Sequence, residues 1–259
     1  MDTLPPELIL SLVRFLPLAS LIAARGVNTQ WRSLAQTASL YPTRKTLLDL
    51  YLAAIAHPNF PSLATVLQPH VREFDREAYI ADLISRGCVL PDLFELWVLE
   101  WPSKAVHFWA WPGLVKDPPI NHECYCGWGN VLGGPMPTIR AIPVPKKEAT
   151  SVWMTCQGLA LWEAELWFWG GVVRLYLVVD ANESINDRLA GRLVWAHSYY
   201  DDAIERTGPE HNMRLFYNAP FVADDLIAFL DLLDLDRGPV EDTLKGYYLG
   251  AGIRFVEMR

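Results

Sequence analysis

Apolar residues near the start of the chain recur at steps of one, three and four, which places them on one face of a helix. They are Leu8, Ile9, Leu12, Val13 and Leu16. Thr3 is expected to cap this helix, with Pro5, Pro6 and Glu7 in its first turn, where proline loses no hydrogen bond and a carboxylate faces the positive end of the dipole. Pro17 is expected to stop it.

Two further short helices follow with almost no loop. Ser20 is expected to cap the second and Gly26 to end it, while Asn28 caps a third helix whose inward residues are Trp31, Leu34 and Ala35. A bundle below roughly 40 residues rarely buries enough apolar surface to be stable alone. Its surplus apolar face therefore needs a partner, in this chain or in another.

The helical pattern continues to about residue 87. Helices are expected over residues 46–56, 62–68 and 75–86, separated by Pro58 and Pro61 and ended by Gly87. We interpret residues 1–42 as one helical module, 43–87 as a helical neck and 88–259 as a separate domain.

The third region mixes helices and strands. A helix over 93–100 comes first, and strands are expected at 106–110, 138–142, 151–155, 166–169, 172–180 and 192–197. Gly170 and Gly171 suggest a tight hairpin, 182–187 a second turn, and 219–233 a late helix. This order favours the α+β class, with a mixed, mostly antiparallel sheet packed with helices.

Composition narrows the classes of partner. The 259 residues are 51% hydrophobic and 20% charged, so the chain should fold, and a net charge of -8 leaves no basic face for nucleic acid or anionic lipid. No run of roughly 18 apolar residues predicts a membrane span, and the basic start of a signal peptide is missing. We expect a cytoplasmic or nuclear protein with reduced cysteines.

The first thirty or so residues resemble the F-box, the adaptor-binding motif of SCF-type ubiquitin ligases. The positions that carry the resemblance are Leu4, Pro5, Glu7, Leu8, Ile9, Leu12, Leu16, Pro17, Leu21, Ile22, Val27 and Trp31. Ser20 and Asn28 stand where many family members have Asp and Cys. The resemblance implies that these twelve residues bind a Skp-family adaptor and, through it, a cullin. The alternative is an ordinary helical hairpin packed on its own domain.

The third region resembles, over fewer features, the SUKH superfamily of fungal Smi/Knr-type regulators. The features are Leu90-Pro91 before a helix, the strand from Leu175, the Gly191-containing strand ending near Trp195, and Ala219-Pro220-Phe221 opening a late helix. The pairing of an F-box with such a domain resembles fungal proteins.

Candidate chemistry is sparse. The cluster at residues 122–126 offers His122, Cys124 and Cys126 without a second pair of ligands, so we expect no metal and no cofactor. The common nucleophile and phosphate-loop motifs are missing, and the acidic group around Asp201, near His197, is typical of a solvated loop.

Nine of the 11 tryptophans fall between Trp97 and Trp169. Those in the strands are expected in the core. Those on or beside proline- and glycine-rich loops are candidates for binding a target protein, since large aromatics in loops often serve binding. They are Trp101, Trp109, Trp111 and Trp128.

The sequence thus predicts a non-catalytic substrate receptor of an SCF-type ligase, with an unknown protein target held by the third region. Two alternatives stay open: a regulatory scaffold that acts outside any ligase by protein contacts of a SUKH-like domain, and an enzyme whose active site lacks a known motif.

Overall fold

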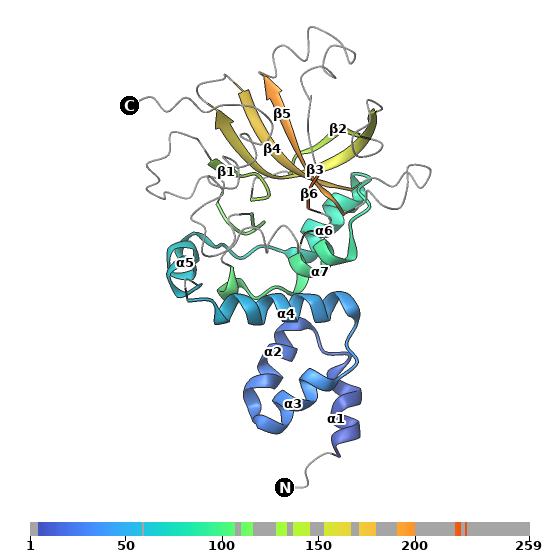
Figure 1. The fold of residues 1–259 in the computed structure, drawn as a ribbon, viewed down its shortest axis with the longest axis vertical. Coiled ribbons are helices and arrows are strands. Elements are labelled where there is room, and N and C mark those ends of the chain that lie inside the picture. Colours follow the sequence, from blue (N-terminus) through green and yellow to red (C-terminus); the bar gives the residue numbers. More distant parts are fainter. Residues whose placement is uncertain are drawn as a thin grey trace. The chain divides into compact units, whose positions relative to one another are not determined.

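A computed structural model describes residues 5–58, 60–106, 110–115, 128–133, 137–145, 153–166, 171–179, 191–199, 221–223 and 226. The chain forms two compact units, Met1–His107 and Phe108–Arg259. In the described residues the first unit is helical and the second contains a sheet (Figure 1). The division comes later in the chain than the expected boundary at 87/88, because the helix at Asp92–Glu100 packs on helices of the first unit.

The N-terminal bundle consists of α1 (Pro6–Val13), α2 (Leu18–Val27) and α3 (Thr29–Thr37). Asn28 caps α3 as predicted, its side-chain oxygen accepting a hydrogen bond of 2.8 Å from the Trp31 N–H. The other two starts differ from the prediction. Pro5 stands at the N-cap of α1, and Thr3 lies outside the described residues.

The second helix begins earlier and ends later than predicted. Pro17, with its extended backbone, is the N-cap of α2, so Ser20 lies inside the helix and is not its cap. Gly26 also lies inside, and α2 runs on to Val27. The first helix ends at Val13, before Pro17, where bonds from Phe15 N to Leu12 O and from Leu16 N to Val13 O tighten the last turn.

The core of the bundle is small and closed. It consists of five buried residues: Ile9, Val13, Leu21, Ala35 and Ala38. Leu10, Leu16, Trp31, Leu34 and Leu40 pack against it. The cluster ends at Leu40, so it has no member from the helices that follow.

The rest of the first unit contains α4 (Pro42–Ala56), α5 (Phe60–Leu67), α6 (Arg76–Ser85) and α7 (Asp92–Glu100), with 3-10 turns at Gln68–His70 and Ser103–Ala105. We call this part the neck from here on; it extends beyond the predicted neck of residues 43–87. The four helices confirm the predicted ones, although α4 starts earlier because Pro42 suits the first turn of a helix. Asp75 caps α6, and Gly87, with φ of 86°, follows its end. Within this unit α4 lies between the bundle and α7 (Figure 1), and it contacts α2, α5 and α7.

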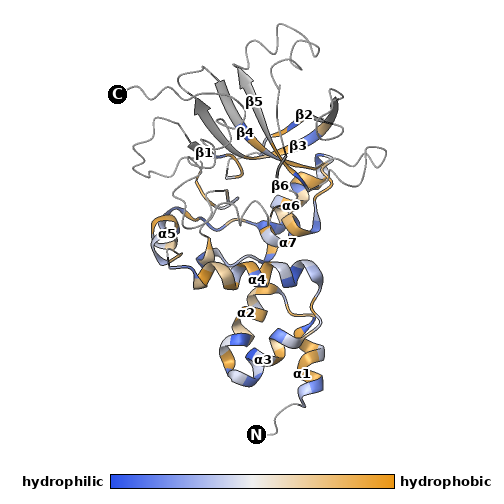
Figure 2. Ribbon diagram, viewed as in Figure 1, coloured by the Kyte–Doolittle hydropathy of each residue, from blue (hydrophilic) through white to orange (hydrophobic). Residues whose placement is uncertain are grey.

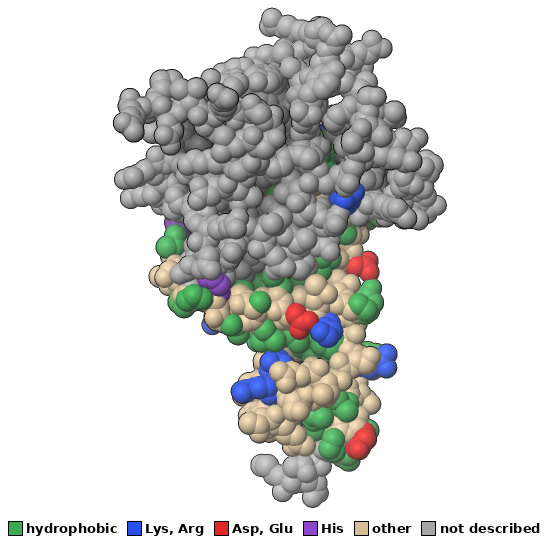
Figure 3. Space-filling model, in the orientation of Figure 1, with side chains coloured by type: hydrophobic (Ala, Val, Ile, Leu, Met, Phe, Trp, Pro, Cys, Tyr) green, Lys and Arg blue, Asp and Glu red, His purple; other side chains and the backbone are tan. Residues whose placement is uncertain are grey.

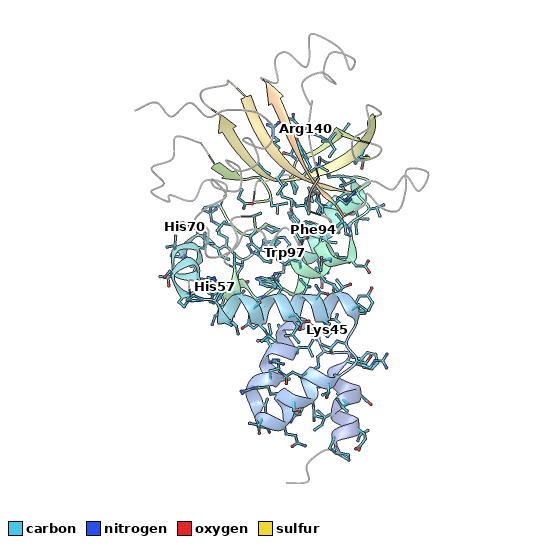
Figure 4. All side chains as sticks on the ribbon, in the orientation of Figure 1. Lys45, His57, His70, Phe94, Trp97 and Arg140 are labelled. Atoms are coloured by element: carbon cyan, nitrogen blue, oxygen red, sulfur yellow. The ribbon has the colours of Figure 1, made fainter. Side chains whose placement is uncertain are left out.

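Hydrophobic positions alternate with hydrophilic ones around these helices (Figure 2). On α7 the buried side chains are Phe94, Trp97 and Val98, the first two labelled in Figure 4. The α6 residue Arg76 donates to the carbonyl oxygens of Val98, Leu99 and Trp101, which satisfies acceptors at the end of α7. Burial there lowers the pKa of the Arg76 guanidinium.

Among its described residues the second unit contains a six-stranded sheet, and the strand pairings seen there are antiparallel. The order is β1-β3-β4-β5-β6, and β2 also pairs with β3. The strands are β1 (Trp128–Asn130), β2 (Ile139–Pro145), β3 (Trp153–Leu166), β4 (Gly171–Val178), β5 (Leu193–Tyr199) and β6 (Phe221–Ala223). This arrangement of helices followed by an antiparallel sheet agrees with the predicted α+β class.

Several details of the sheet differ from the sequence prediction. The short strand expected at 151–155 is the start of one 14-residue strand, β3, which reaches Leu166. The late helix expected over 219–233 is wrong at its start, because Phe221–Ala223 pairs with β5 instead; Leu226 is helical and buried. Val106 and Ala110 lie in no strand. Of the hairpin turn expected at Gly170 and Gly171, only Gly171 is described, as the first residue of β4. The turn expected at 182–187 falls outside the described residues.

The central strand β4 is covered on both faces. Five consecutive residues, from Leu175 to Val179, are each at most 3% exposed, although neighbours in a strand point to opposite faces. Gly158 of β3 makes room for two side chains, since a Cβ there would lie 2.6 Å from Ile142 Cδ1 and 3.0 Å from Tyr176 Cδ1.

Two segments of the second unit are joined by the buried Asn130. Its Nδ2 donates to the Trp111 oxygen at 2.7 Å and to the Leu114 oxygen at 2.9 Å. Gly133 allows this approach, because a Cβ at that position would lie 1.7 Å from the Leu114 oxygen.

Candidate protein-binding surface

Helix α1 carries two apolar stripes with opposite exposures. Ile9 and Val13 are 3% and 0% exposed and belong to the bundle core. Leu8 and Leu12 are 52% and 53% exposed, and Phe15, just past the helix, is 74% exposed. The predicted single face of α1 is therefore divided, with one half packed inward and the other open.

The division follows from helical geometry. Ile9, Val13 and Leu16 are spaced i, i+4, i+7 and so share one side, and Leu8, Leu12 and Phe15 have the same spacing one residue earlier. One residue turns a helix by about 100°, so both stripes cannot pack on α3. Hydrophobic side chains accordingly gather on the surface over α1 (Figure 3). We call Leu8, Leu12 and Phe15 the outward stripe.

Charged groups flank the outward stripe. Glu7 is exposed in the first turn of α1. The Arg14 guanidinium carbon lies 5.2 Å from the centre of the Phe15 ring, within cation–π range.

The structure distributes the other residues of the F-box pattern over several environments. Pro5 and Pro17 are exposed N-caps, Leu21 is buried, and Leu16, Ile22 and Trp31 are half-buried. Val27 is 63% exposed at the end of α2. Leu4 falls outside the described residues. The pattern omits Phe15, which its i+7 spacing from Leu8 identifies.

A half-buried ion pair joins α4 to α7, and its carboxylate also binds the bundle. Arg44 of α4 donates through Nε to Glu100 Oε2 at 2.9 Å and through Nη2 to Oε1 at 2.6 Å, with side chains 18% and 13% exposed. The Leu18 N–H, at the start of α2, donates to the same Oε2 at 2.8 Å. The hydrogen bond to Glu100 raises the pKa of Arg44.

Two of the four candidate target-binding tryptophans are core residues. Trp101 is 0% exposed and donates through Nε1 to the Ala105 oxygen at 3.1 Å, and Trp111 is 1% exposed. Neither offers surface to a partner in this structure. Trp109 lies outside the described residues, and of Trp128 only the backbone, in β1, is described.

No group of three or more His, Cys, Asp or Glu side chains in the described part of the chain could hold a metal ion. The cluster at 122–126 and the acidic group around Asp201 lie outside that part. Cys88 and Cys156 are buried, and burial raises the pKa of the Cys88 thiol. Within the same ranges, no helix is long and apolar enough to cross a membrane.

Comparison with known proteins agrees with the geometry of the bundle. Residues 1–44 match the family model described as F-box-like. They contain α1, α2, α3 and the start of α4. No curated protein and no solved structure matches the chain. The N-terminal bundle is thus an F-box-like domain, the class of module that binds Skp-family adaptors.

Proposed function

We propose that this chain is the substrate receptor of an SCF-type ubiquitin ligase. The outward stripe of α1 binds a Skp-family adaptor, the adaptor links the chain to a cullin, and the second unit holds a target protein. The observation that carries the proposal is the outward stripe itself, three large apolar side chains left exposed by an F-box-like bundle.

The energetics favour a protein partner for this stripe. Burying a Leu or Phe side chain contributes roughly 1.5–3 kcal/mol, so three of them supply much of what a specific complex needs. The inward stripe already fills the bundle core, and therefore the bundle gains nothing by covering the outward one itself.

The chain performs no bond chemistry in this proposal. Its contribution is to raise the concentration of a target lysine near the charged conjugating enzyme, which requires only two binding surfaces and a connection of set length. We place the complex in the cytoplasm, the nucleus or both.

For the second unit we propose a SUKH-like target-binding domain. The antiparallel pairing of β4 with β5, and Gly191 at φ of 86° just before β5, support it. An experimental structure of the full chain tests the assignment: a sheet of different strand order from the SUKH domains would rule it out.

The direct test is the double variant Leu8→Asp with Leu12→Asp. Both side chains point away from the bundle core, so the chain should stay folded while adaptor affinity falls by roughly 100-fold or more. Pull-down of the purified adaptor by the full chain measures the loss.

The matched control is Ile84→Asp with Val89→Asp, which places two charges on apolar residues of the neck with similar exposure, 53% and 49%. It should bind adaptor like the wild type. Equal adaptor binding by the two double variants would contradict the proposal. Adding cullin to the wild-type complex then separates a ligase subunit, which forms a ternary complex, from a scaffold that binds the adaptor alone.

A further inference from the structure

The start of α2 lacks a local acceptor for its first N–H groups. Its N-cap is Pro17, whose side chain makes no capping bond, and its first turn holds no acidic residue. Leu18, the first helical residue, is fully buried, so water cannot serve its N–H. The acceptor is Glu100 Oε2, 82 positions along the chain.

Glu100 is placed unfavourably for its own helix. It is the last residue of α7, where the helix dipole disfavours a carboxylate. The positive end of α2 and the two hydrogen bonds from Arg44 offset this cost. The position of Glu100 is explained by the two groups it joins and not by α7.

The hydrogen bond to Glu100 is one of several connections between the bundle α1–α3 and the helices α4–α7. The core cluster of the bundle ends at Leu40, and α4 begins at Pro42, so the two bodies do not share that cluster. The helices α2 and α4 are also in contact, and Tyr41, in the segment between α3 and α4, donates to Asp92 of α7 at 2.6 Å. A change in the orientation of the bundle on the neck would break the hydrogen bond between the Leu18 N–H and the Glu100 carboxylate.

We infer that Glu100 is a positioning residue that fixes the orientation of the bundle α1–α3 on the helices α4–α7. It does so by capping α2 from α7 while Arg44 holds the carboxylate in place. The reason for a fixed orientation rests on the proposed function, because a receptor must hold its target at a set distance from the adaptor.

The test measures the distance between spin labels on Gln36 of α3 and Ala81 of α6, both exposed, by double electron–electron resonance on the full chain with and without adaptor. Labels attached through an unnatural amino acid avoid the native cysteines. Glu100→Ala should roughly double the width of the distance distribution. Adaptor affinity should not change, because the outward stripe is untouched.

Two further variants separate capping from ion pairing. Glu100→Gln keeps an acceptor for the Leu18 N–H and should keep the distribution narrow. The charge reversal Arg44→Glu with Glu100→Arg keeps an ion pair but gives Leu18 no acceptor from position 100, and should leave the distribution wide.

A narrow distribution in both Glu100→Ala and the reversal would overturn the inference, as would rescue by the reversal alone. If Glu100→Ala does not fold, the inference is tested by comparing the distance distribution of Glu100→Gln with that of the charge-reversal variant. If the wild type does not bind the adaptor, the proposed function is contradicted instead. The distances measured in the free chain would still test whether Glu100 fixes the orientation of the bundle on the neck.

Discussion

The two units of this chain differ in the exposure of their apolar side chains. In the first, the outward stripe of α1 is more than half exposed beside a filled core. In the second, consecutive residues of β4 are buried, and no large hydrophobic among its described side chains is exposed. Trp101 and Trp111 are buried, so a tryptophan on or beside a loop is not by itself a sign of a binding surface. The binding surface is indicated instead by a helix that carries a second apolar stripe, which its own bundle cannot cover.

The largest effect on stability should come from the second unit, through Gly133→Ala. The new Cβ would lie 1.7 Å from the Leu114 oxygen, a backbone atom that cannot move aside without breaking the bonds made by Asn130. We expect a loss of roughly 3 kcal/mol or more of unfolding free energy, measured by urea denaturation followed by tryptophan fluorescence.

Gly26→Ala in the first unit is the matched control. Nothing lies within 4 Å of its Cβ position, and Ala is favoured over Gly inside a helix by about 0.5–1 kcal/mol. The variant should be slightly more stable than the wild type. Equal losses in the two glycine variants would contradict the packing described for the second unit.

Trp101→Ala tests whether a predicted binding residue is a core residue. A fully buried tryptophan replaced by alanine should cost about 3–5 kcal/mol of unfolding free energy. Trp101→Phe should cost less, since it retains most of the ring and loses the hydrogen bond to Ala105. A cost below about 1 kcal/mol for the alanine variant would return Trp101 to the binding candidates.

The smallest effect is expected for Tyr79→Phe. The Tyr79 hydroxyl is buried with no hydrogen-bond partner among the described residues, so its removal should change the unfolding free energy at pH 7 by less than about 1 kcal/mol. The variant should differ more in alkali. Burial raises the pKa of Tyr79 above its usual 10.0.

The sign of that pH effect follows from linkage. Because the folded pKa lies above the unfolded one, the stabilising contribution is complete below pH 10.0 and is lost as the pH rises, when the unfolded state releases its proton first. Denaturation curves on either side of pH 10.0 should show a steeper loss for the wild type than for the phenylalanine variant. Parallel losses would contradict burial of the hydroxyl.

Local signals predicted much of this fold. Asn28, Asp75 and Gly87 act at helix ends as their chemistry indicates, and apolar spacing with proline and glycine breaks predicts the helices of the neck. Two of the misses depend on pairing between distant residues. Phe221–Ala223 becomes a strand because β5 is available to it, and α2 starts at Leu18 because Glu100 supplies its cap.

The candidate site shows the same limit. Apolar spacing identified α1 but could not divide its face, since which stripe is buried depends on where α3 lies. The pattern of the F-box omitted Phe15, although it is the most exposed large hydrophobic of the outward stripe. Loop position suggested surface tryptophans, yet Trp101 packs in a T-shaped arrangement with Tyr51 at 6.1 Å.

The most direct test of the account compares two neighbouring residues of α1 in one pair of measurements. Calorimetric titration gives adaptor affinity and urea denaturation gives stability for Leu12→Ala and Val13→Ala. Leu12→Ala should weaken adaptor binding by about 10- to 100-fold and leave stability unchanged, because its side chain faces outward. Val13→Ala should lower the unfolding free energy by roughly 2 kcal/mol and leave the affinity of the folded chain unchanged. Unchanged affinity in Leu12→Ala would contradict the central claim that the outward stripe of α1 is the adaptor-binding surface.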